Sequence, residues 1–178
     1  SIYSLHPKPK ASFERSGQFI LDPATALIVP AQRSQGTTRA ISFLQKEIKK
    51  AIGDTLQVLI EAQLSGRNAI RIGEHDSYPL MTSRLQNVMP AGETIPPAQG
   101  YIIDINAGEI VLAGSNQDGT FNGVSTLVQL FIDQGNYARI SSVHSWDYPD
   151  YPIRWNFSMH NLRGANAITT LRTITDTM

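Results

Sequence analysis

The stretch from Gly100 to Phe131, GYIIDINAGEIVLAGSNQDGTFNGVSTLVQLF, constrains the fold of this chain more than any other. It begins with two short apolar runs separated by an Asn-Ala-Gly turn, which is the pattern of a β-hairpin. Alternation places Tyr101, Ile103 and Ile105 on one face of the first strand and Asp104 on the other. A polar loop then leads into a segment whose apolar residues recur at helical spacing. The stretch therefore predicts a hairpin that runs directly into a packed helix.

The loop and the helix of this stretch have a packing explanation. The glycines of Gly114–Gly123, GSNQDGTFNG, allow a tight turn and a close approach of the helix to the sheet. The loop lacks the lysine and the Ser or Thr of a phosphate-binding P-loop. Asp118 or Thr120 is the expected helix cap, and Gly135 is the expected stop. The expected buried stripe consists of Phe121, Val124, Leu127, Val128 and Phe131.

A second amphipathic helix is predicted upstream, from Thr37 to Ile52, with Gly53 as its stop and lysines in its last turn. Residues 1–12 hold two prolines and predict an extended lead-in. Residues 73–99 predict a long surface excursion, with roughly one helical turn at Tyr78–Val88. Short strands are predicted at Phe19–Leu21, Ala26–Val29, Leu56–Ile60 and Ala69–Ile72.

These elements together predict an α+β domain, with one mixed, mostly antiparallel sheet and two helices packed on one face. The composition changes past Ile140, so we place the domain at residues 1–150 and a separate unit at residues 151–178. In that unit, Ile153–Met159 predicts a strand. Ala165–Met178 has the apolar spacing of a helix.

Charge and cysteine content exclude several classes of function. Lys and Arg total 15 and Asp and Glu total 15, so no excess charge is available to hold a nucleic acid or a membrane surface. Cysteine is absent, which removes disulfides, thiolate catalysis and Cys-based metal sites. The four histidines, His6, His75, His144 and His160, share no metal-ligand spacing. We therefore expect no metal, no cofactor, no nucleic-acid partner and no membrane partner.

Catalytic motifs are absent as well, since the chain has no HExxH, no P-loop and no GxSxG. The most site-like polar group is His160 with Asn161 and Arg163, at the end of a predicted strand. A solvent-exposed strand end explains the same residues more simply. We expect no catalytic residue in this chain, because no nucleophile and base are placed together.

Aromatic residues concentrate between residues 143 and 157, VHSWDYPDYPIRWNF. Trp146, Tyr148, Tyr151 and Trp155 support two interpretations. Large aromatic side chains commonly cover a joint between two domains. Flat rings also stack on sugar faces, which would make this segment part of a carbohydrate-binding module.

Three stretches carry a family likeness: PKPKASFERSGQFILDPATALIV, GYIIDINAGEIVLAGSNQDGTFNGVSTLVQLF and ISSVHSWDYPDYPIRW. In this order they resemble the N-terminal non-catalytic domain of family 20 glycoside hydrolases, the β-N-acetylhexosaminidases. The likeness covers about residues 5 to 155. It implies a zincin-like α/β layer without the metal site, in a periplasmic or secreted protein. Related domains precede catalytic barrels in other glycosidase families, which is the alternative assignment.

The resemblance also implies what lies beyond the domain. Ile153–Met159 and Ala165–Met178 would be the first strand and first helix of a (β/α)8 barrel, which takes about 250 residues in full. The family's chemistry uses an adjacent Asp-Glu pair in that barrel, and this chain has no Asp-Glu dipeptide. Arg163 is the nearest match to an arginine that holds sugar hydroxyls in the family. The implied partners are the downstream barrel and an oligo- or polysaccharide.

Overall fold

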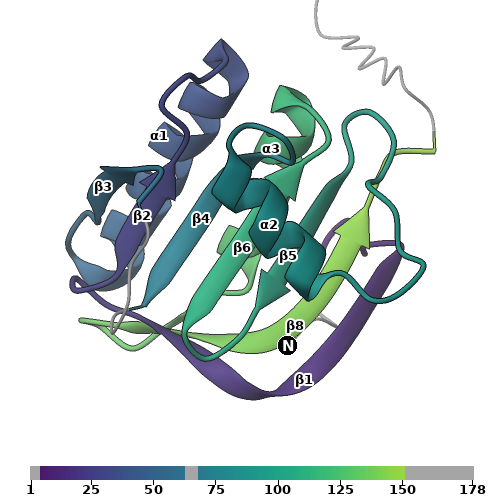
Figure 1. Cartoon of the computed structure of the whole chain (residues 1–178). Helices are drawn as coiled ribbons and strands as arrows, with labels where there is room; N and C mark the ends of the chain where they lie inside the picture. The colour runs from purple at the N-terminus through teal and green to yellow at the C-terminus, as the bar shows by residue number, and fades with distance from the viewer. Residues whose placement is uncertain (1–4, 63–67, 151–178) are drawn as a thin grey trace, which may run out of the picture.

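The computed structural model describes residues 5–62 and 68–150 of the chain. Figure 1 shows the fold, with the colour following the sequence from the N-terminus to the C-terminus. The strands are β1 (Ala11–Leu21), β2 (Ala26–Val29), β3 (Gln57–Ile60), β4 (Ala69–Glu74), β5 (Tyr101–Ile105), β6 (Glu109–Gly114), β7 (Ile132–Asp133) and β8 (Ala138–Asp147). The helices are α1 (Gln35–Ile52), α2 (Pro79–Val88) and α3 (Gln117–Gln129).

One mixed sheet runs through the domain in the order β1-β8-β5-β6-β4-β2-β3, with β7 beside β8. Strands β1, β8, β5 and β6 pair antiparallel, and β7 pairs antiparallel with β8. Strands β6, β4, β2 and β3 pair parallel. The parallel neighbours β2 and β3 are joined by α1, because parallel strands need a long crossover. The predicted α+β class with a mixed sheet is confirmed.

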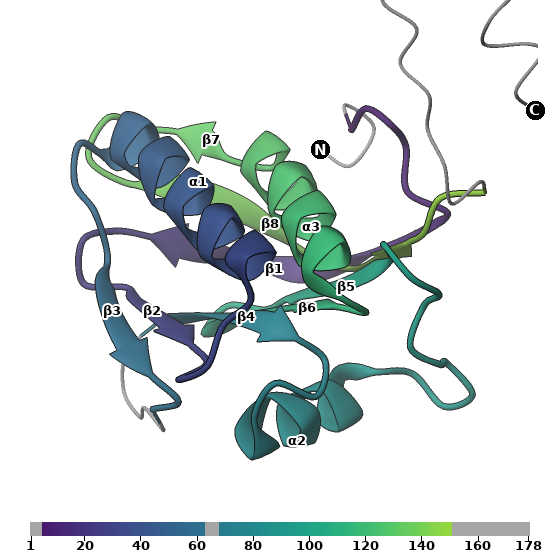
Figure 2. The same ribbon diagram turned by 90° about the horizontal axis from the view of Figure 1, so that it is seen from above.

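Helices α1 and α3 cover one face of the sheet, as predicted, and Figure 2 shows them side by side. Ser34 caps α1, because its Oγ accepts a hydrogen bond from the backbone N–H of Thr37 at 3.1 Å. Gly53 ends α1 with φ 81°, which confirms the predicted stop. The core on this side includes Leu44, Ile48, Tyr101, Ile103, Ile105, Ile110, Leu112, Val124 and Leu127.

Helix α2 corrects the prediction of about one turn at Tyr78–Val88. It has ten residues and lies on the face of the sheet opposite α1 and α3 (Figure 2). Met81 and Leu85 pack there against the sheet residues Ile102 and Val111. Prolines and glycines spread through residues 73–99 indicated irregular structure, but Pro79 occupies the first turn of the helix, where its missing N–H leaves no intrahelical bond unmade.

The start and the end of α3 also differ from the prediction. Asn116 is the cap, with its Oδ1 accepting from the backbone N–H of Gly119 at 2.9 Å, so neither Asp118 nor Thr120 has this role. Gly135 lies in the turn between β7 and β8 with φ 93° and does not end the helix.

The predicted packing of α3 is confirmed in part. Val124 and Leu127 are buried, but Phe121 is 39% exposed and its ring stacks on that of Phe43. The predicted close approach of helix and sheet is present at Gly123, where an added Cβ would lie 3.0 Å from a methyl carbon of Leu112.

Two long strands were missed in part by the sequence analysis. β8 lies between β1 and β5, so the first residues of the aromatic segment at 143–157 belong to a central strand. β1 starts at Ala11, inside the predicted lead-in, and extends the short strand expected at Phe19–Leu21. Pairing between β1 and β8 joins residues more than one hundred positions apart, which local patterns do not reveal.

Candidate functional site

The end of β8 is tied to the N-terminal segment by a group that we call the exit cluster: Lys10, Trp146, Asp147, Tyr148 and Asp150. The backbone N–H of Lys10 donates to Asp147 Oδ1 at 3.2 Å, and the Lys10 ammonium pairs with Asp150 Oδ1. The hydrogen bond to Asp150 raises the pKa of Lys10, so the ammonium stays charged at neutral pH. These contacts set the direction in which the chain leaves the sheet.

The two aromatic residues of the exit cluster contact each other. The rings of Trp146 and Tyr148 are parallel within 4°, with 5.9 Å between their centroids. Lys10 Nζ lies 4.7 Å from the centroid of the Tyr148 ring, a cation–π distance. Trp146 also packs against the core on the α2 side. Two of the four predicted aromatic residues are therefore already engaged within the domain.

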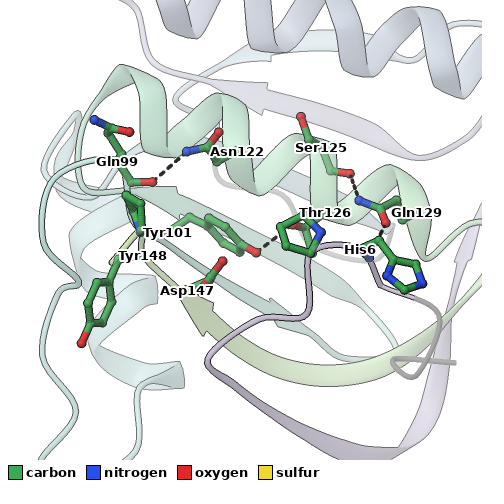
Figure 3. Close-up of a pocket in the computed structure, with 11 residues that line it drawn as sticks. His6, Gln99, Tyr101, Asn122, Ser125, Thr126, Gln129, Asp147 and Tyr148 are labelled. Carbon is green, nitrogen blue, oxygen red and sulfur yellow. Dashed lines mark hydrogen bonds between the residues drawn. The ribbon is translucent and has the colours of Figure 1, made fainter. Parts of the chain in front are cut away.

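A small polar cavity of about 120 Å³ lies beside the exit cluster (Figure 3). Its lining residues bond to one another through side chains and backbone groups. Tyr101 Oη and Thr126 Oγ1 are 2.7 Å apart, and Asn122 Nδ2 donates to the Gln99 carbonyl at 2.9 Å. Burial raises the pKa of Tyr101 to about 12, so its phenol is protonated at neutral pH and cannot act as a base. The cavity has room for a small polar group.

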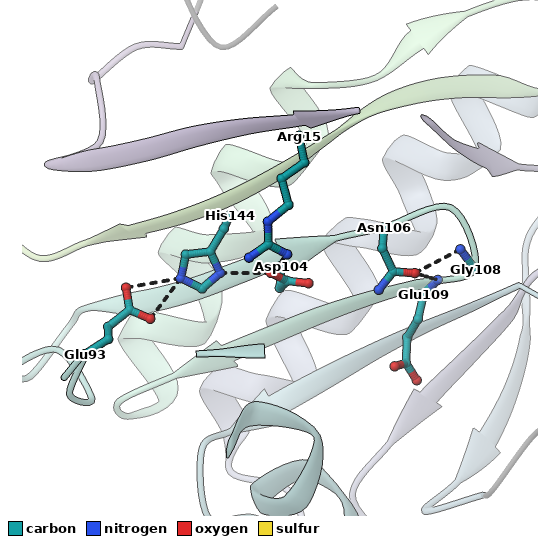
Figure 4. Close-up of polar contacts among 7 residues, drawn as sticks. All are labelled: Arg15, Glu93, Asp104, Asn106, Gly108, Glu109 and His144. Atoms are coloured by element: carbon teal, nitrogen blue, oxygen red, sulfur yellow. Dashed lines mark hydrogen bonds and ion pairs between the residues drawn. The ribbon is translucent and has the colours of Figure 1, made fainter. Parts of the chain in front are cut away.

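A second polar group, the carboxylate cluster, lies on the α2 side of the sheet and consists of Arg15, Glu93, Asp104 and His144 (Figure 4). Asp104 of β5 and His144 of β8 face each other across the antiparallel pair, and each side chain is 1% exposed. Nδ1 of His144 lies 2.9 Å from Asp104 Oδ1, and Nε2 lies 2.8 Å from Glu93 Oε2. Arg15 of β1 donates to Asp104 Oδ1 at 2.7 Å.

These contacts determine the charge of the buried imidazole. Burial alone would lower the pKa of His144, but the hydrogen bonds and negative charges of Asp104 and Glu93 outweigh it and raise the pKa. Both ring nitrogens are occupied by carboxylates, so the imidazole has no free nitrogen for a substrate. The geometry indicates a structural cluster and not a general-base site.

A third buried charge, Arg71 on β4, was also missed by the sequence analysis. Its side chain is 1% exposed, its Nε donates to Glu109 Oε1 at 2.5 Å, and one guanidinium nitrogen donates to the Ala62 carbonyl at 2.9 Å. Burial raises the pKa of the neighbouring Tyr78 to about 12. A single charged residue in an otherwise apolar strand is the sequence signal for these two buried polar groups. Arg71 in AIRI indicates one, and Asp104 in YIIDI indicates the carboxylate cluster.

The other predicted site residues are not placed by the structure. Tyr151, Trp155, His160 and Arg163, the strand Ile153–Met159 and the helix Ala165–Met178 lie outside the described residues. Their proposed roles, and the division of the chain at residue 150, stay predictions. Within residues 5–62 and 68–150, no three His, Cys, Asp or Glu residues are arranged to hold a metal ion. No helix in this part of the chain is both long and apolar enough to cross a membrane.

Comparisons with known proteins agree with this architecture. The family model described as "Glycosyl hydrolase family 20, domain 2" matches residues 3–148. Among solved structures, the chain resembles the family 20 β-N-acetylhexosaminidase of Streptomyces coelicolor A3(2), with a TM-score of 0.59 and 19% identity over 82% of this chain and 26% of that one. For the Flavobacterium johnsoniae chitobiase, the TM-score is 0.57, with 13% identity over 82% of this chain and 20% of that one.

A structure named CpGH84B is similar as well, with a TM-score of 0.62 and 18% identity over 85% of this chain and 23% of that one. At these identities the likeness concerns the fold alone. The chain spans only 20% to 26% of the length of these three structures. No curated protein sequence matches the chain.

Proposed function

This chain belongs to the domain 2 family of glycosyl hydrolase family 20, and on that premise we propose that it is a non-catalytic accessory domain of a β-N-acetylhexosaminidase. In this role it supports a catalytic barrel that follows it in the complete polypeptide. The observation that carries the proposal is the family match, which extends from residue 3 to residue 148 and so includes every described strand and helix.

The exit cluster supports the role of a rigid mount. β8 is hydrogen-bonded to β1 on one side and to β5 on the other, so its position is fixed on both edges. Lys10 holds Asp147, the last residue of β8, and Asp150 beyond the strand. A domain that positions a barrel needs a fixed path for the connecting chain, because a flexible path would allow the two units to move independently.

The polar groups of the described residues support a non-catalytic role. His144 is enclosed by two carboxylates, and Tyr101 is held protonated by burial. Among the described side chains, we find no nucleophile that contacts an available base. The family's chemistry needs an adjacent Asp-Glu pair, which the sequence does not contain.

The hexosaminidase type rests on the family match and on the names of structural relatives such as the Streptomyces coelicolor enzyme. CpGH84B favours a second candidate, an accessory domain in a different glycoside hydrolase family, because its name indicates family 84 and it shares the fold. The coding sequence downstream of Met178 distinguishes the two. A barrel with an adjacent Asp-Glu pair supports the hexosaminidase, and a barrel of another family supports the second candidate.

We predict that the purified chain, residues 1–178, does not hydrolyse p-nitrophenyl N-acetyl-β-D-glucosaminide, because its acid and its orienting carboxylate are absent. Release of nitrophenol is measured against a buffer blank and against a known hexosaminidase as positive control. Turnover that persists through repurification and elutes with the chain would overturn the non-catalytic role.

The same preparation tests the carbohydrate-binding alternative. Chitooligosaccharides are titrated while tryptophan fluorescence is followed, since Trp146 and Trp155 are the two tryptophans of the chain. A purely supporting domain gives no saturable change. A saturable change that is lost in Trp146→Phe would assign sugar binding to the exit cluster, where the Trp146 and Tyr148 rings already stack on each other.

A further inference from the structure

The segment between α2 and β5, residues 89–99, is attached to the sheet by a single charged contact. Glu93 lies within this segment, its side chain is 10% exposed, and its carboxylate oxygens lie 2.8 and 3.1 Å from His144 Nε2. Among the described residues, the Glu93 carboxylate bonds to no other side chain. The contact therefore depends on one ring nitrogen.

Proton counting shows what this contact requires. An imidazolium carries two N–H groups and can donate to Asp104 and to Glu93 at once, whereas a neutral imidazole carries one and can donate to only one carboxylate. The single proton of a neutral imidazole is needed most at Asp104, because this carboxylate is 1% exposed, is fixed in β5 and has an Oδ2 without a partner among the described residues. Glu93 lies in a loop and can exchange the imidazole for water, so it is the carboxylate that loses its partner.

We propose that the segment 89–99 is a pH-sensitive strap, which the protonated His144 holds against the sheet and the deprotonated His144 releases. The charged groups that face the imidazole come from each element packed around it: Arg15 from β1, Asp104 from β5 and Glu93 from the strap itself. With His144 protonated, two positive and two negative charges balance. Without that proton, the cluster carries an uncompensated negative charge next to the apolar core on the α2 side.

The direction of the pH dependence follows from linkage. Asp104 stays beside the ring in both states, whereas Glu93, whose hydrogen bond and negative charge raise the pKa of His144, contacts the ring only in the closed strap, so the closed strap has the higher His144 pKa. Closure is therefore fully favoured below the open-state pKa and is lost as the pH rises through the closed-state pKa. Each pH unit between these two midpoints changes the closing equilibrium about tenfold.

The released part of the strap is limited by contacts at its C-terminal end. The backbone N–H of Gln99 donates to Asn116 Oδ1 at 3.1 Å, and Ser115 Oγ donates to the Pro97 carbonyl at 2.7 Å. Only residues 90–95 therefore move away from the sheet when the strap opens. Ile95 packs on the same α2-side core as Trp146, so release loosens the apolar cluster that supports one ring of the exit cluster.

The test is amide hydrogen exchange of the whole chain from pH 5.5 to 8.5, corrected for the intrinsic rate at each pH. NMR of the His144 ring reports its protonation in the same samples. We expect protection of the amides of residues 91–95 to fall as the pH rises, by up to about tenfold per pH unit. The midpoint of this fall should coincide with the midpoint of the His144 titration. Protection in α3 stays constant.

Glu93→Gln removes the charge of the strap and leaves the sheet intact. In this variant we expect protection of residues 91–95 to lose its dependence on pH, because the amide of Gln can accept from a protonated ring nitrogen and donate to a deprotonated one. We also expect a lower titration midpoint for His144, because the negative charge beside it is gone. His75→Gln, a histidine outside the carboxylate cluster, keeps the profile of the unchanged chain. The proposal is wrong if protection of the strap does not depend on pH, or if Glu93→Gln keeps the dependence.

Discussion

Replacing Gly119 with alanine lowers the free energy of unfolding by about 3 kcal/mol, because the added methyl group has no space. A Cβ at this position would overlap the carbonyl oxygen of Gly100, at the contact between the start of α3 and the start of β5. The obstacle is backbone, so no side chain can turn away and the helix itself has to move. The gain in helix propensity from glycine to alanine, about 1 kcal/mol, opposes only part of this loss.

Gly108 provides the matched control for this substitution. It lies in the hairpin turn, where the nearest atom to an added Cβ is Asn106 Oδ1 at 3.9 Å. We expect Gly108→Ala to change stability by about 0.5 kcal/mol or less. Urea unfolding measures both variants, with the slope of the transition checked for equality with that of the unchanged chain. Equal stability of the two variants would contradict the close contact between α3 and the sheet.

Replacing Arg71 with methionine lowers the free energy of unfolding by about 3 kcal/mol, because it leaves a nearly buried carboxylate without its main partner. Glu109 is 17% exposed on its side chain and is bonded by Arg71 Nε. The Ala62 carbonyl loses a donor in the same variant. Methionine approximately preserves the volume, so the loss reports the missing charge and hydrogen bonds more than a cavity.

Arg84 supplies the control for this second substitution, because it approaches the same carboxylate from the surface. Its Nε lies 3.7 Å from Glu109 Oε2, and its side chain is 41% exposed. We expect Arg84→Met to cost about 0.5 kcal/mol, as is usual for exposed ion pairs. Chemical denaturation again gives the comparison. If Arg84→Met lowers the free energy of unfolding as much as Arg71→Met does, the burial of Arg71 does not explain its contribution to stability.

The parts of the fold that the sequence predicts well are those specified by neighbouring residues. Periodicity located the hairpin of β5 and β6 and both helices on one face of the sheet, since these patterns repeat over two to four residues. The glycines at the start of α3 correctly indicated close packing with the sheet. The end of α1 at Gly53 was also predicted correctly, because a glycine directly after a helix is a signal from neighbouring residues.

The parts that sequence analysis missed depend on contacts between distant residues. β1 pairs with β8, and the parallel strands pair with one another, although these segments lie apart in the sequence. The residue pattern of a single strand does not indicate which other strand it pairs with. The carboxylate cluster assembles residues 15, 93, 104 and 144, and only Asp104, a lone charge in the apolar strand YIIDI, carries a local signal. Helix α2 was predicted at only about one turn for a different reason, because the prolines and glycines of residues 73–99 indicated irregular structure, whereas Pro79 lies in the first turn of the helix.

We propose that this domain supports a catalytic barrel and takes no part in hydrolysis. The most direct test expresses the polypeptide with the coding sequence beyond Met178, once complete and once without residues 1–150. Thermal unfolding and hydrolysis of p-nitrophenyl N-acetyl-β-D-glucosaminide are measured for both. We predict that the complete polypeptide hydrolyses the substrate and that the shortened one unfolds at a lower temperature or fails to fold. A shortened polypeptide with the same Tm and the same kcat/KM would contradict the account.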